Sequence, residues 1–460
     1  MAQVPVPIWD GHESVVECHH HSWEMLFRKL HSPEPGSGFV RNYIYTPFGH
    51  SVFVWGSCFI TMFAKYLGPV FPCIRQLDNF YAHQEDDGFI PRQMHIHDGQ
   101  SEFPKEDPDS EGGDIFAWAE REWARFSGDA SRFPAVYPVL LAYHRWIRAN
   151  RTRPDGTYVS SGWGCGMDNI PRFDTEKYDL VHGTADIAWI DATLQQLFDA
   201  KNLLAMAETA GIEDGREELR EEIDRLSAFV RERMWNERAG LYVDLTGEGT
   251  PSDVEHVGGF WAFLAGVADG ERARRLAETA QDPERFAMVT GTASLSAKHP
   301  GFDTDGGGCY WQGGIWCIMD YMLVKGLEAA GLGADAHRVA RRHVEAVAKI
   351  HETTGTVWES YAPRAYAPGK CWGETVRKDF VGFSGVTPIA LFLENVLGID
   401  ATVERIVWNV RLTERHGVRN LHLPDGTVID LLCEARSSPS EKPVVTIQSS
   451  RPIRLEVRMG

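Results

Sequence analysis

Asp168 lies in a short segment, residues 160–173, that is rich in glycine and aromatic residues. The segment holds three glycines, one proline and two large aromatic rings, Trp163 and Phe173. This glycine density disfavours a helix, and the alternation typical of a strand is missing. We therefore expect a shaped loop whose glycines let the backbone approach a ligand closely. A tight helix–helix connection with a capping Asp is the alternative explanation.

Two further segments combine glycine, aromatic rings and a carboxylate in a related way. Residues 356–363 place Glu359 between two aromatic rings, and residues 306–316 form a glycine-flanked aromatic run before an expected helix. Flat rings stack on the C–H faces of a sugar, while its hydroxyl groups need polar partners. Three such segments in one chain predict a carbohydrate pocket with two candidate acid/base groups, Asp168 and Glu359.

The composition excludes several classes of function. The chain has 460 residues, of which 43% are hydrophobic, so a sizeable core is available. The 65 acidic and 46 basic residues give a net charge of −19, which argues against binding to nucleic acid or to an anionic membrane. No apolar run reaches the length of a membrane span, and the eight cysteines show no metal-site spacing.

From this we expect a small carbohydrate as the partner, with no cofactor, no metal, no nucleic acid and no membrane. A homo-oligomer is left open. The N-terminal residues lack the basic and apolar regions of a signal peptide, so we expect a cytoplasmic location.

Apolar periodicity predicts a mainly α-helical chain before residue 400. The expected helices are 14–31, 52–66, 74–84, 112–126, 134–149, 183–210, 214–234, 257–269, 271–280, 283–289, 314–331, 335–352 and 385–397. Paired helices in this number favour a toroid of inner and outer helices over a bundle. From Val403 the pattern alternates between turn signals, which predicts a small C-terminal β appendage.

Three segments resemble motifs of glycoside hydrolase family 63, a family of (α/α)6-barrel glycosidases, and more distantly those of the trehalases. Residues 164–173 resemble the Gly-x-Asp-Asn-x-x-Arg-Trp loop that carries the general acid there. Residues 310–316 resemble the Tyr-Trp-Arg-Gly-Pro-x-Trp helix entry, and residues 358–361 resemble the Glu-x-Tyr segment that carries the general base. The resemblance runs from about residue 53 to 397. It implies a catalytic (α/α)6 toroid of the six-hairpin type at 1–400 and a small β-sheet domain at 401–460, packed on the barrel.

The chain also departs from the family pattern at positions that would contact the sugar. Gly56 replaces an Asp that helps to hold the sugar in the −1 subsite, and Gln312 replaces an Arg. Gly314 replaces a Pro, and Phe383 stands where the family has Trp. A site built to bind a particular hydroxyl group rejects analogues strongly, so we do not expect the −1 sugar to be restricted to glucose.

The mechanism implied by the resemblance is inverting hydrolysis of an α-linked glycoside or oligosaccharide. Asp168 would be the protonated general acid, and Glu359 would be the base that activates water. Such a pair lies roughly 6.5–9.5 Å apart, against about 5–5.5 Å for a retaining pair. The acid also needs a pKa raised by burial and by a negative neighbour.

The expected substrate-binding residues share these loops and their flanks. They are Trp55, Phe59, Gln84, Asp87, Arg92, Trp163, Asn169, Arg172, Trp311, Gln312, Gly313, Trp316, Trp358, Tyr361 and Phe383. The two arginines would hold substrate oxygens or orient a carboxylate, and an ion pair between barrel helices is the alternative for Arg172. Other loop carboxylates are expected to bind hydroxyl groups or cap helices: Asp87, Asp303, Asp305 and Glu374.

Other interpretations of the same barrel remain open. A glycoside phosphorylase would need a phosphate site near Glu359, and a sugar epimerase would need paired histidines at the mouth, for which His95 and His97 are the candidates. A lyase, or a carbohydrate-binding protein without turnover, is also compatible with the pattern. The Gly at position 56 motivates the non-catalytic interpretation, whereas the presence of both Asp168 and Glu359 argues against it.

Overall fold

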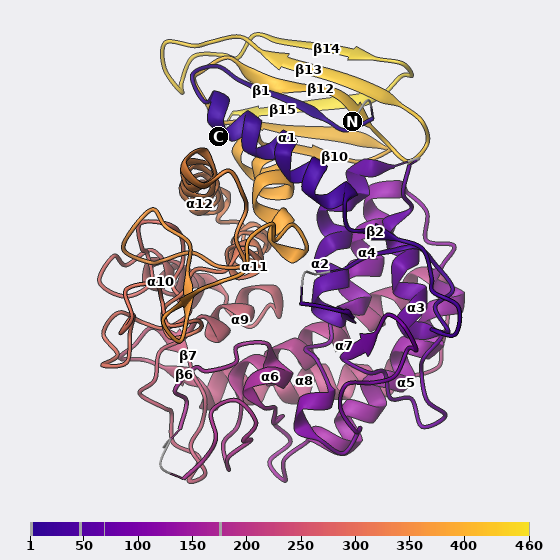
Figure 1. Ribbon diagram of the computed structural model, residues 1–460, viewed down its shortest axis with the longest axis vertical. Helices are drawn as coiled ribbons and strands as arrows, with labels where there is room; N and C mark the ends of the chain where they lie inside the picture. The colour runs from indigo at the N-terminus through magenta and orange to yellow at the C-terminus, as the bar shows by residue number, and fades with distance from the viewer. Residues whose placement is uncertain (1–2, 46–47, 69, 174–176, 460) are drawn as a thin grey trace.

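The computed structural model describes residues 3–45, 48–68, 70–173 and 177–459, and most of its regular structure is helical (Figure 1). The α-helices are α1 (Glu13–Phe27), α2 (Val54–Ala64), α3 (Asp78–Tyr81), α4 (Phe116–Ser127), α5 (Phe133–Arg151), α6 (Gly162–Cys165), α7 (Ile190–Ala210), α8 (Arg216–Arg233), α9 (Trp261–Leu264), α10 (Gly270–Ala280), α11 (Cys317–Ala329) and α12 (Gly333–Thr354). Short 3-10 helices are η1 (Lys65–Leu67), η2 (Cys73–Leu77), η3 (Pro108–Ser110), η4 (Val257–Phe260) and η5 (Phe383–Val386), and η6 (Thr387–Val396) is a π-helix.

The strands are short before residue 399 and longer after it. They are β1 (Val6–Trp9), β2 (Leu30–His31), β3 (Tyr43–Ile44), β4 (Ser51–Phe53), β5 (Gln93–His95), β6 (Trp235–Asn236), β7 (Leu241–Tyr242), β8 (Lys370–Cys371), β9 (Glu374–Thr375), β10 (Ile399–Ala401), β11 (Arg405–Val410), β12 (His416–His422), β13 (Val428–Cys433), β14 (Val445–Ser449) and β15 (Arg454–Met459).

One set of helical segments is connected by contacts in a cyclic order. α2 packs on α4, α4 on α7, α7 on α9 and α9 on α11, and the segment η5–η6 contacts both α11 and α2. Other helices pack on members of this set: α5 and α8 contact α7, and α12 contacts α11 and η6. α1 lies against α12 and η6.

The sequence of α2 explains its central place. All of its residues are buried except Trp55, and a helix that is apolar on every side belongs in a protein interior. Trp55 is the partly exposed member, so its ring is the one that this helix can offer to a cavity.

Several expected helices begin later than predicted, because the loop residues before them stay non-helical. The helix expected at 183–210 begins at Ile190, and the one expected at 314–331 begins at Cys317. The prediction of a helix at 283–289 is wrong: the N–H groups of Arg285, Phe286 and Ala287 all donate to the carbonyl of Asp282, which closes a turn.

Two sheets lie at one end of the molecule, above the helices in Figure 1. The four-stranded antiparallel sheet has the order β1-β12-β13-β14, and the three-stranded sheet has the order β10-β11-β15, in which β11 and β15 are parallel. β1 pairs with β12, with Val6 opposite Arg419, so the N-terminal strand completes the C-terminal sheet. The expected division at residue 400 stays a prediction.

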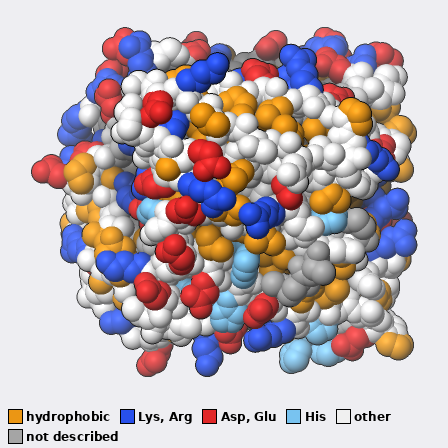
Figure 2. Space-filling view, turned by 90° about the horizontal axis from the view of Figure 1, so that it is seen from above, with side chains coloured by type: hydrophobic (Ala, Val, Ile, Leu, Met, Phe, Trp, Pro, Cys, Tyr) orange, Lys and Arg blue, Asp and Glu red, His pale blue; other side chains and the backbone are white. Residues whose placement is uncertain are grey.

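The surface at this end mixes charges of both signs. Figure 2 looks onto it and shows acidic and basic side chains interspersed with small apolar areas. Among the described residues, no helix combines the length and the apolar character needed to cross a bilayer. Each of the eight cysteines is a free thiol.

Candidate active site

A cavity of about 360 Å³ opens where α2, α6 and several loops meet. Its lining is dominated by aromatic rings, with two guanidinium groups and one carboxylate among them. The lining residues are Phe48, Phe53, Trp55, Gly56, Arg92, Gln93, Gly112, Trp163, Gly164, Gly166, Asp168, Tyr310, Trp311, Trp316, Ile318, Cys371, Trp372, Arg377 and Phe383.

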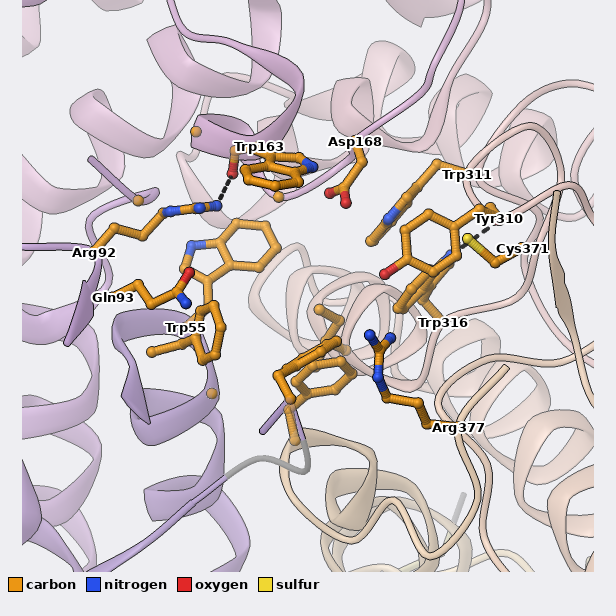
Figure 3. Close-up of a pocket in the computed structure, with 18 of the residues that line it drawn as sticks. Trp55, Arg92, Gln93, Trp163, Asp168, Tyr310, Trp311, Trp316, Cys371 and Arg377 are labelled. Carbon is orange, nitrogen blue, oxygen red and sulfur yellow. Dashed lines mark hydrogen bonds between the residues drawn. The ribbon is translucent and has the colours of Figure 1, made fainter. Parts of the chain in front are cut away.

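The structure brings seven of the sequence-predicted residues into this lining: Trp55, Arg92, Trp163, Asp168, Trp311, Trp316 and Phe383. Figure 3 shows the Asp168 carboxyl group pointing into the cavity, between the rings of Trp163 and Trp311. Trp311 and Trp316 stack on each other with ring centroids 4.0 Å apart. The cavity therefore offers both flat apolar walls and a polar group that faces the enclosed space.

The environment of Asp168 suits a proton donor. Burial raises the pKa of Asp168 to about 7; the positive charge of Arg92 opposes this rise, and the negative charges of Glu359 and Asp109 add to it. A carboxyl group with such a pKa holds its proton in weakly acidic solution, where an ordinary Asp is ionised.

The loop that carries Asp168 is shaped by Ser161 and Gly166. Ser161 caps α6, because its hydroxyl oxygen accepts a hydrogen bond from the N–H of Gly164 at 2.9 Å. Gly166 ends the helix with a φ of +74°, and a Cβ at this position would lie 2.9 Å from the ring of Trp55. The glycine-rich sequence thus allows the turn after α6 to pack directly on the cavity wall.

Asn169 joins this loop to the aromatic segment of the opposite wall. Its side-chain oxygen accepts from the N–H of Trp311 at 2.8 Å, and its amide nitrogen donates to the carbonyl of Cys309 at 3.0 Å. The side chain of Gln312 donates to the backbone carbonyl of Asn169 at 3.1 Å. Asn169 and Gln312 therefore fix the two loops relative to each other, and both lie outside the cavity lining.

Glu359 is fully buried behind two residues of the cavity wall. Its carboxylate accepts a hydrogen bond from the hydroxyl of Tyr310 at 2.8 Å and one from the backbone N–H of Arg377 at 3.2 Å. The Arg377 guanidinium lies 3.2 Å from the same carboxylate, so the buried negative charge has a positive partner. Tyr310 and Arg377 both line the cavity.

The phenol of Tyr310 lies close to both carboxyl groups. Burial raises its pKa, and the negative charges of Asp168 and Glu359 raise it further. Tyr310 also has a φ of +64°, which is rare for a bulky residue, and its N–H donates to the carbonyl of Lys370 at 2.6 Å. This backbone conformation turns the phenol toward Glu359.

Other predicted substrate contacts hold the framework together and lie outside the lining. Arg172 is buried and forms ion pairs with Asp191 and Asp244, the latter at 3.1 Å. Its guanidinium also stacks 4.3 Å from the ring centroid of Trp189. Arg172 thus forms ion pairs, as in the alternative interpretation, but they run from its loop to Asp191 of α7 and to a second loop at Asp244, and do not join two helices. Gly313 is buried, and its N–H donates to the hydroxyl of Ser294 at 3.1 Å.

The remaining predicted residues also lie outside the cavity lining. Phe59 is buried in the core behind Trp55, and Gln84 donates to the backbone carbonyls of Gly88 and Val139. Asp87 is exposed and pairs with Lys105 at 2.8 Å.

Trp358 and Tyr361 flank Glu359 in the chain without joining the lining. The indole of Trp358 donates to Thr354 at 3.0 Å, and Tyr361 is buried with its hydroxyl accepting from the N–H of Trp358. The histidine pair that an epimerase would need is also elsewhere: at the surface, His95 contacts Glu102 and His97 contacts Glu34, each at 2.7 Å.

Several lining residues had not been predicted: Phe48, Phe53, Gln93, Tyr310, Cys371, Trp372 and Arg377. Tyr310 opens the aromatic run that carries Trp311, so its place beside Trp311 was the available signal. Arg377 follows a short β8–β9 hairpin in a stretch without helical or strand periodicity, and no local pattern marks it.

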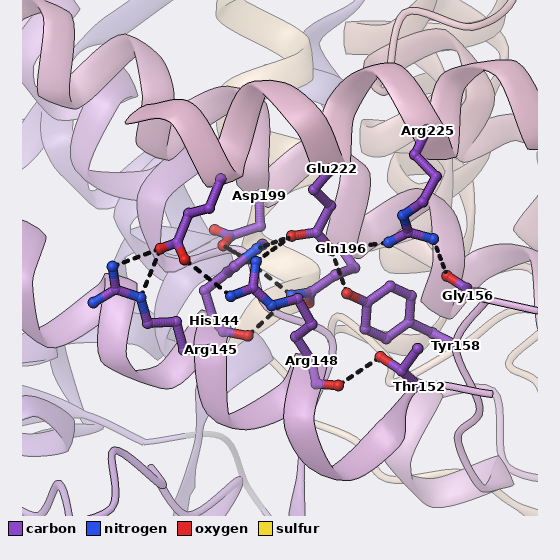
Figure 4. A network of polar contacts seen from close by, with 11 residues as sticks. His144, Arg145, Arg148, Thr152, Gly156, Tyr158, Gln196, Asp199, Glu222 and Arg225 are labelled. Carbon is purple, nitrogen blue, oxygen red and sulfur yellow. Dashed lines mark hydrogen bonds and ion pairs between the residues drawn. The ribbon is translucent and has the colours of Figure 1, made fainter. Parts of the chain in front are cut away.

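A polar network lies among α5, α7 and α8 and ties these helices together (Figure 4). His144 contacts Asp199 at 2.8 Å and Glu222 at 2.9 Å. Burial alone would lower the pKa of His144, but these two carboxylates raise it to about 10. A second, small cavity is lined by Gln196 and Tyr158 of this network, and it shares Gly112 and Gly164 with the lining of the candidate active-site cavity. Within the described ranges, no group of three or more His, Cys, Asp or Glu side chains is placed to hold a metal ion.

Comparison with known proteins assigns the family. Residues 51–373 match the model of the "Mannosylglycerate hydrolase MGH1-like glycoside hydrolase domain". The chain belongs to this glycoside hydrolase family. It is therefore a glycosidase of the family 63 type, and the resemblance inferred from the motifs is confirmed.

Relatives of this hydrolase agree with that assignment. The chain is 28% identical over 284 residues to mannosylglycerate hydrolase MGH1 of Selaginella moellendorffii. The aligned region covers 50% of this chain and 55% of that protein. The match thus spans about half the length of that relative.

Solved structures show the same fold. A mannosylglycerate hydrolase from Thermus thermophilus superposes with a TM-score of 0.63 at 22% identity, covering 82% of this chain and 99% of that one. The neutral trehalase from Saccharomyces cerevisiae gives a TM-score of 0.56 at 16% identity, covering 76% and 73%. This glycosidase is thus mainly helical, with the fold of family 63 enzymes and trehalases and with additional C-terminal strands.

Proposed function

We propose that this glycosidase hydrolyses an α-linked glycoside with inversion, with Asp168 as general acid and Glu359 as general base. The contrast between the two carboxyl groups supports the assignment. Asp168 faces the cavity with a pKa raised to about 7, whereas the charge of Glu359 is compensated by Arg377 and by the phenol of Tyr310. A carboxyl group that faces the cavity with a raised pKa suits the acid, and a second one that accepts hydrogen bonds and is paired with a guanidinium suits the base.

The cyclic contacts of the helices support a finer description of the fold. We take α2, α4, α7, η4–α9, α11 and η5–η6 as the inner wall of an (α/α)6 toroid, because each contacts the next and the last contacts the first. The loops that precede α7 and α11, together with residues 355–382, then gather at one mouth, where a toroid of this type binds its substrate.

The size and lining of the cavity favour a small substrate. A volume of about 360 Å³ is at the lower end of the range of about 300–1,000 Å³ for small-molecule sites. Arg92 and Arg377 in the lining can attract a carboxylate as well as hydroxyl groups. With relatives named mannosylglycerate hydrolases, α-mannosides are the first candidates, and α-glucosides are the second. Gln312 donates to Asn169, so it does not replace the sugar contact of the family Arg.

The test is release of sugar from a panel of α-mannosides and α-glucosides with different leaving groups. Asp168→Asn and Glu359→Gln are expected to lower kcat by about 10²–10⁴-fold each, the usual contribution of a general acid or base. Asp87→Asn, on an exposed carboxylate outside the cavity, is the matched control and should leave kcat unchanged. If both active-site variants kept near-normal turnover while remaining folded, the assignment would be wrong.

A further inference from the structure

Trp372 is an unusually exposed ring at the edge of the cavity. Its exposed fraction is 66%, whereas Trp311 and Trp316, which line the same cavity, are 2% exposed. This gradient places Trp311 and Trp316 at the closed inner end and Trp372 at the mouth. A solvent-exposed indole beside a binding cavity leaves apolar area open to a ligand.

The backbone at Trp372 has a positive φ, a conformation that is unfavourable for a tryptophan residue. Trp372 and Gly373 form the two-residue turn between β8 and β9, with φ values of +50° and +84°. A turn with positive φ at both central residues strongly favours Asn-Gly or Asp-Gly, and a bulky residue at its first position is unfavourable. Such strain is concentrated where function demands a particular side chain.

The hairpin is held in place by the loop of residues 303–310, in which Asp303, Cys309 and Tyr310 also have positive φ values. Its tip is tied down because the N–H of Gly373 donates to the carboxylate of Asp305 at 3.3 Å. The ammonium group of Lys370 donates to the carbonyl of Asp305 at 2.9 Å, and the N–H of Lys370 donates to Gly307. The ring of Trp372 itself lies over Tyr310, with centroids 6.0 Å apart and an interplanar angle of 29°. Trp372 is therefore oriented before any substrate arrives.

We propose that Trp372 is the platform for the leaving group of the substrate, an inference that rests on the proposed glycosidase function. A sugar whose glycosidic oxygen reaches Asp168 occupies the inner part of the cavity, beside the wall of Tyr310 and Arg377 that covers Glu359, and we take the leaving group on its anomeric carbon to project toward the mouth. There it meets the exposed face of Trp372. The geometry selects leaving groups with a flat C–H or aromatic face, such as a second pyranose ring, over leaving groups without a ring.

This selection separates two substrate classes that share the same reacting sugar. A glyceryl or methyl leaving group has little flat surface to stack on an indole, whereas a pyranose or an aryl ring covers it. Preorganisation of the hairpin strengthens the effect, because no side-chain ordering is needed on binding. The chain is therefore expected to act on α-linked disaccharides or larger α-glycosides more efficiently than on glyceryl glycosides.

The decisive variant is Trp372→Asn, which removes the ring and installs a residue that the turn favours. We expect kcat/KM for an α-linked disaccharide to fall by about 10-fold, the equivalent of about 1.4 kcal/mol of lost stacking. For the methyl glycoside of the same sugar, kcat/KM should change by less than about 2-fold, because that substrate does not reach the platform. Trp372→Phe should retain most of the disaccharide activity. Tyr366→Ala removes an exposed ring outside the cavity and should change neither value.

A binding measurement distinguishes failure of this inference from failure of the proposed function. In the Asp168→Asn background, calorimetry should show weaker binding of the disaccharide, and unchanged binding of the free monosaccharide, when Trp372→Asn is added. An equal loss of affinity for both ligands, or no loss for either, would refute the proposed role of Trp372 without refuting the proposed hydrolase function. If the wild-type chain neither bound nor cleaved any α-glycoside, both the function and the platform would be refuted.

Discussion

Replacing Asp168 by Asn is expected to stabilise the folded protein, and to do so more strongly as the pH rises. Asp168 has a folded-state pKa of about 7 against an ordinary value of 3.8, because burial disfavours its charged form. Between these two values the folded state holds a proton that the unfolded state has released, so stability falls as the pH rises through this window. Above pH 7 the whole free-energy cost of burying the ionised Asp168 carboxylate is present, and the neutral Asn side chain avoids this cost.

The magnitude follows from the same rise in pKa. A change from 3.8 to about 7 corresponds to about 4 kcal/mol at pH 8, and to about 0.5 kcal/mol at pH 4. For a chain of 460 residues, 1 kcal/mol shifts the unfolding temperature by about 1 °C, so the variant should unfold up to about 4 °C above the wild type at pH 8. Scanning calorimetry across pH 4–8 measures this difference directly.

The exposed carboxylate Asp87 provides a control of opposite sign. Its pKa is lowered, mainly by the hydrogen bond from Lys105, so its charge stabilises the folded state above the ordinary pKa and this contribution is lost as the pH falls. Asp87→Asn should therefore be slightly destabilising at neutral pH. A temperature difference between Asp168→Asn and wild type that stayed constant from pH 4 to 8 would refute the reasoning about Asp168.

Three further predictions concern the site. In kcat/KM profiles of the wild type, activity should fall as the pH rises above about 7, because Asp168 then loses the proton that it must donate; a profile that is flat to pH 9 would contradict this. Tyr310→Phe removes a hydrogen bond to the charged Glu359 and should lower kcat by about 10- to 100-fold with a small change in KM, since such bonds contribute about 1.5–3 kcal/mol; unchanged kcat in steady-state assays would remove Tyr310 from the mechanism. Asn169→Ala frees the N–H of Trp311 and should raise KM and lower the free energy of unfolding by about 1–3 kcal/mol, measured by urea titration; an unaltered KM would show that the loops are not coupled through this side chain.

The helical body could be predicted from the sequence because apolar periodicity records burial directly. The continuous apolar run of α2 and the regular pattern of α12 are examples, and the alternation after Val403 marked the strands. The strand β1 was missed, since four residues with one Pro carry too little pattern, and its partner β12 lies at the far end of the chain.

The site was harder to predict because sequence proximity does not fix side-chain direction. The glycine and aromatic content marked the loops of Asp168 and Trp311 correctly as cavity walls. Asp87 and Trp358 have equally suggestive neighbours, yet they point to Lys105 and to Thr354. Arg377 reaches Glu359 only through the fold of residues 364–382, which no local periodicity encodes.

The stereochemistry of the first product tests the central claim most directly. Proton NMR can follow the anomeric signal of the sugar released from whichever α-glycoside of the panel is hydrolysed, before mutarotation equilibrates it. Direct attack of water opposite to the leaving group, with Asp168 as acid and Glu359 as base, predicts that the β anomer appears first. Initial release of the α anomer would mean a retaining mechanism, and would contradict the roles assigned to these two residues.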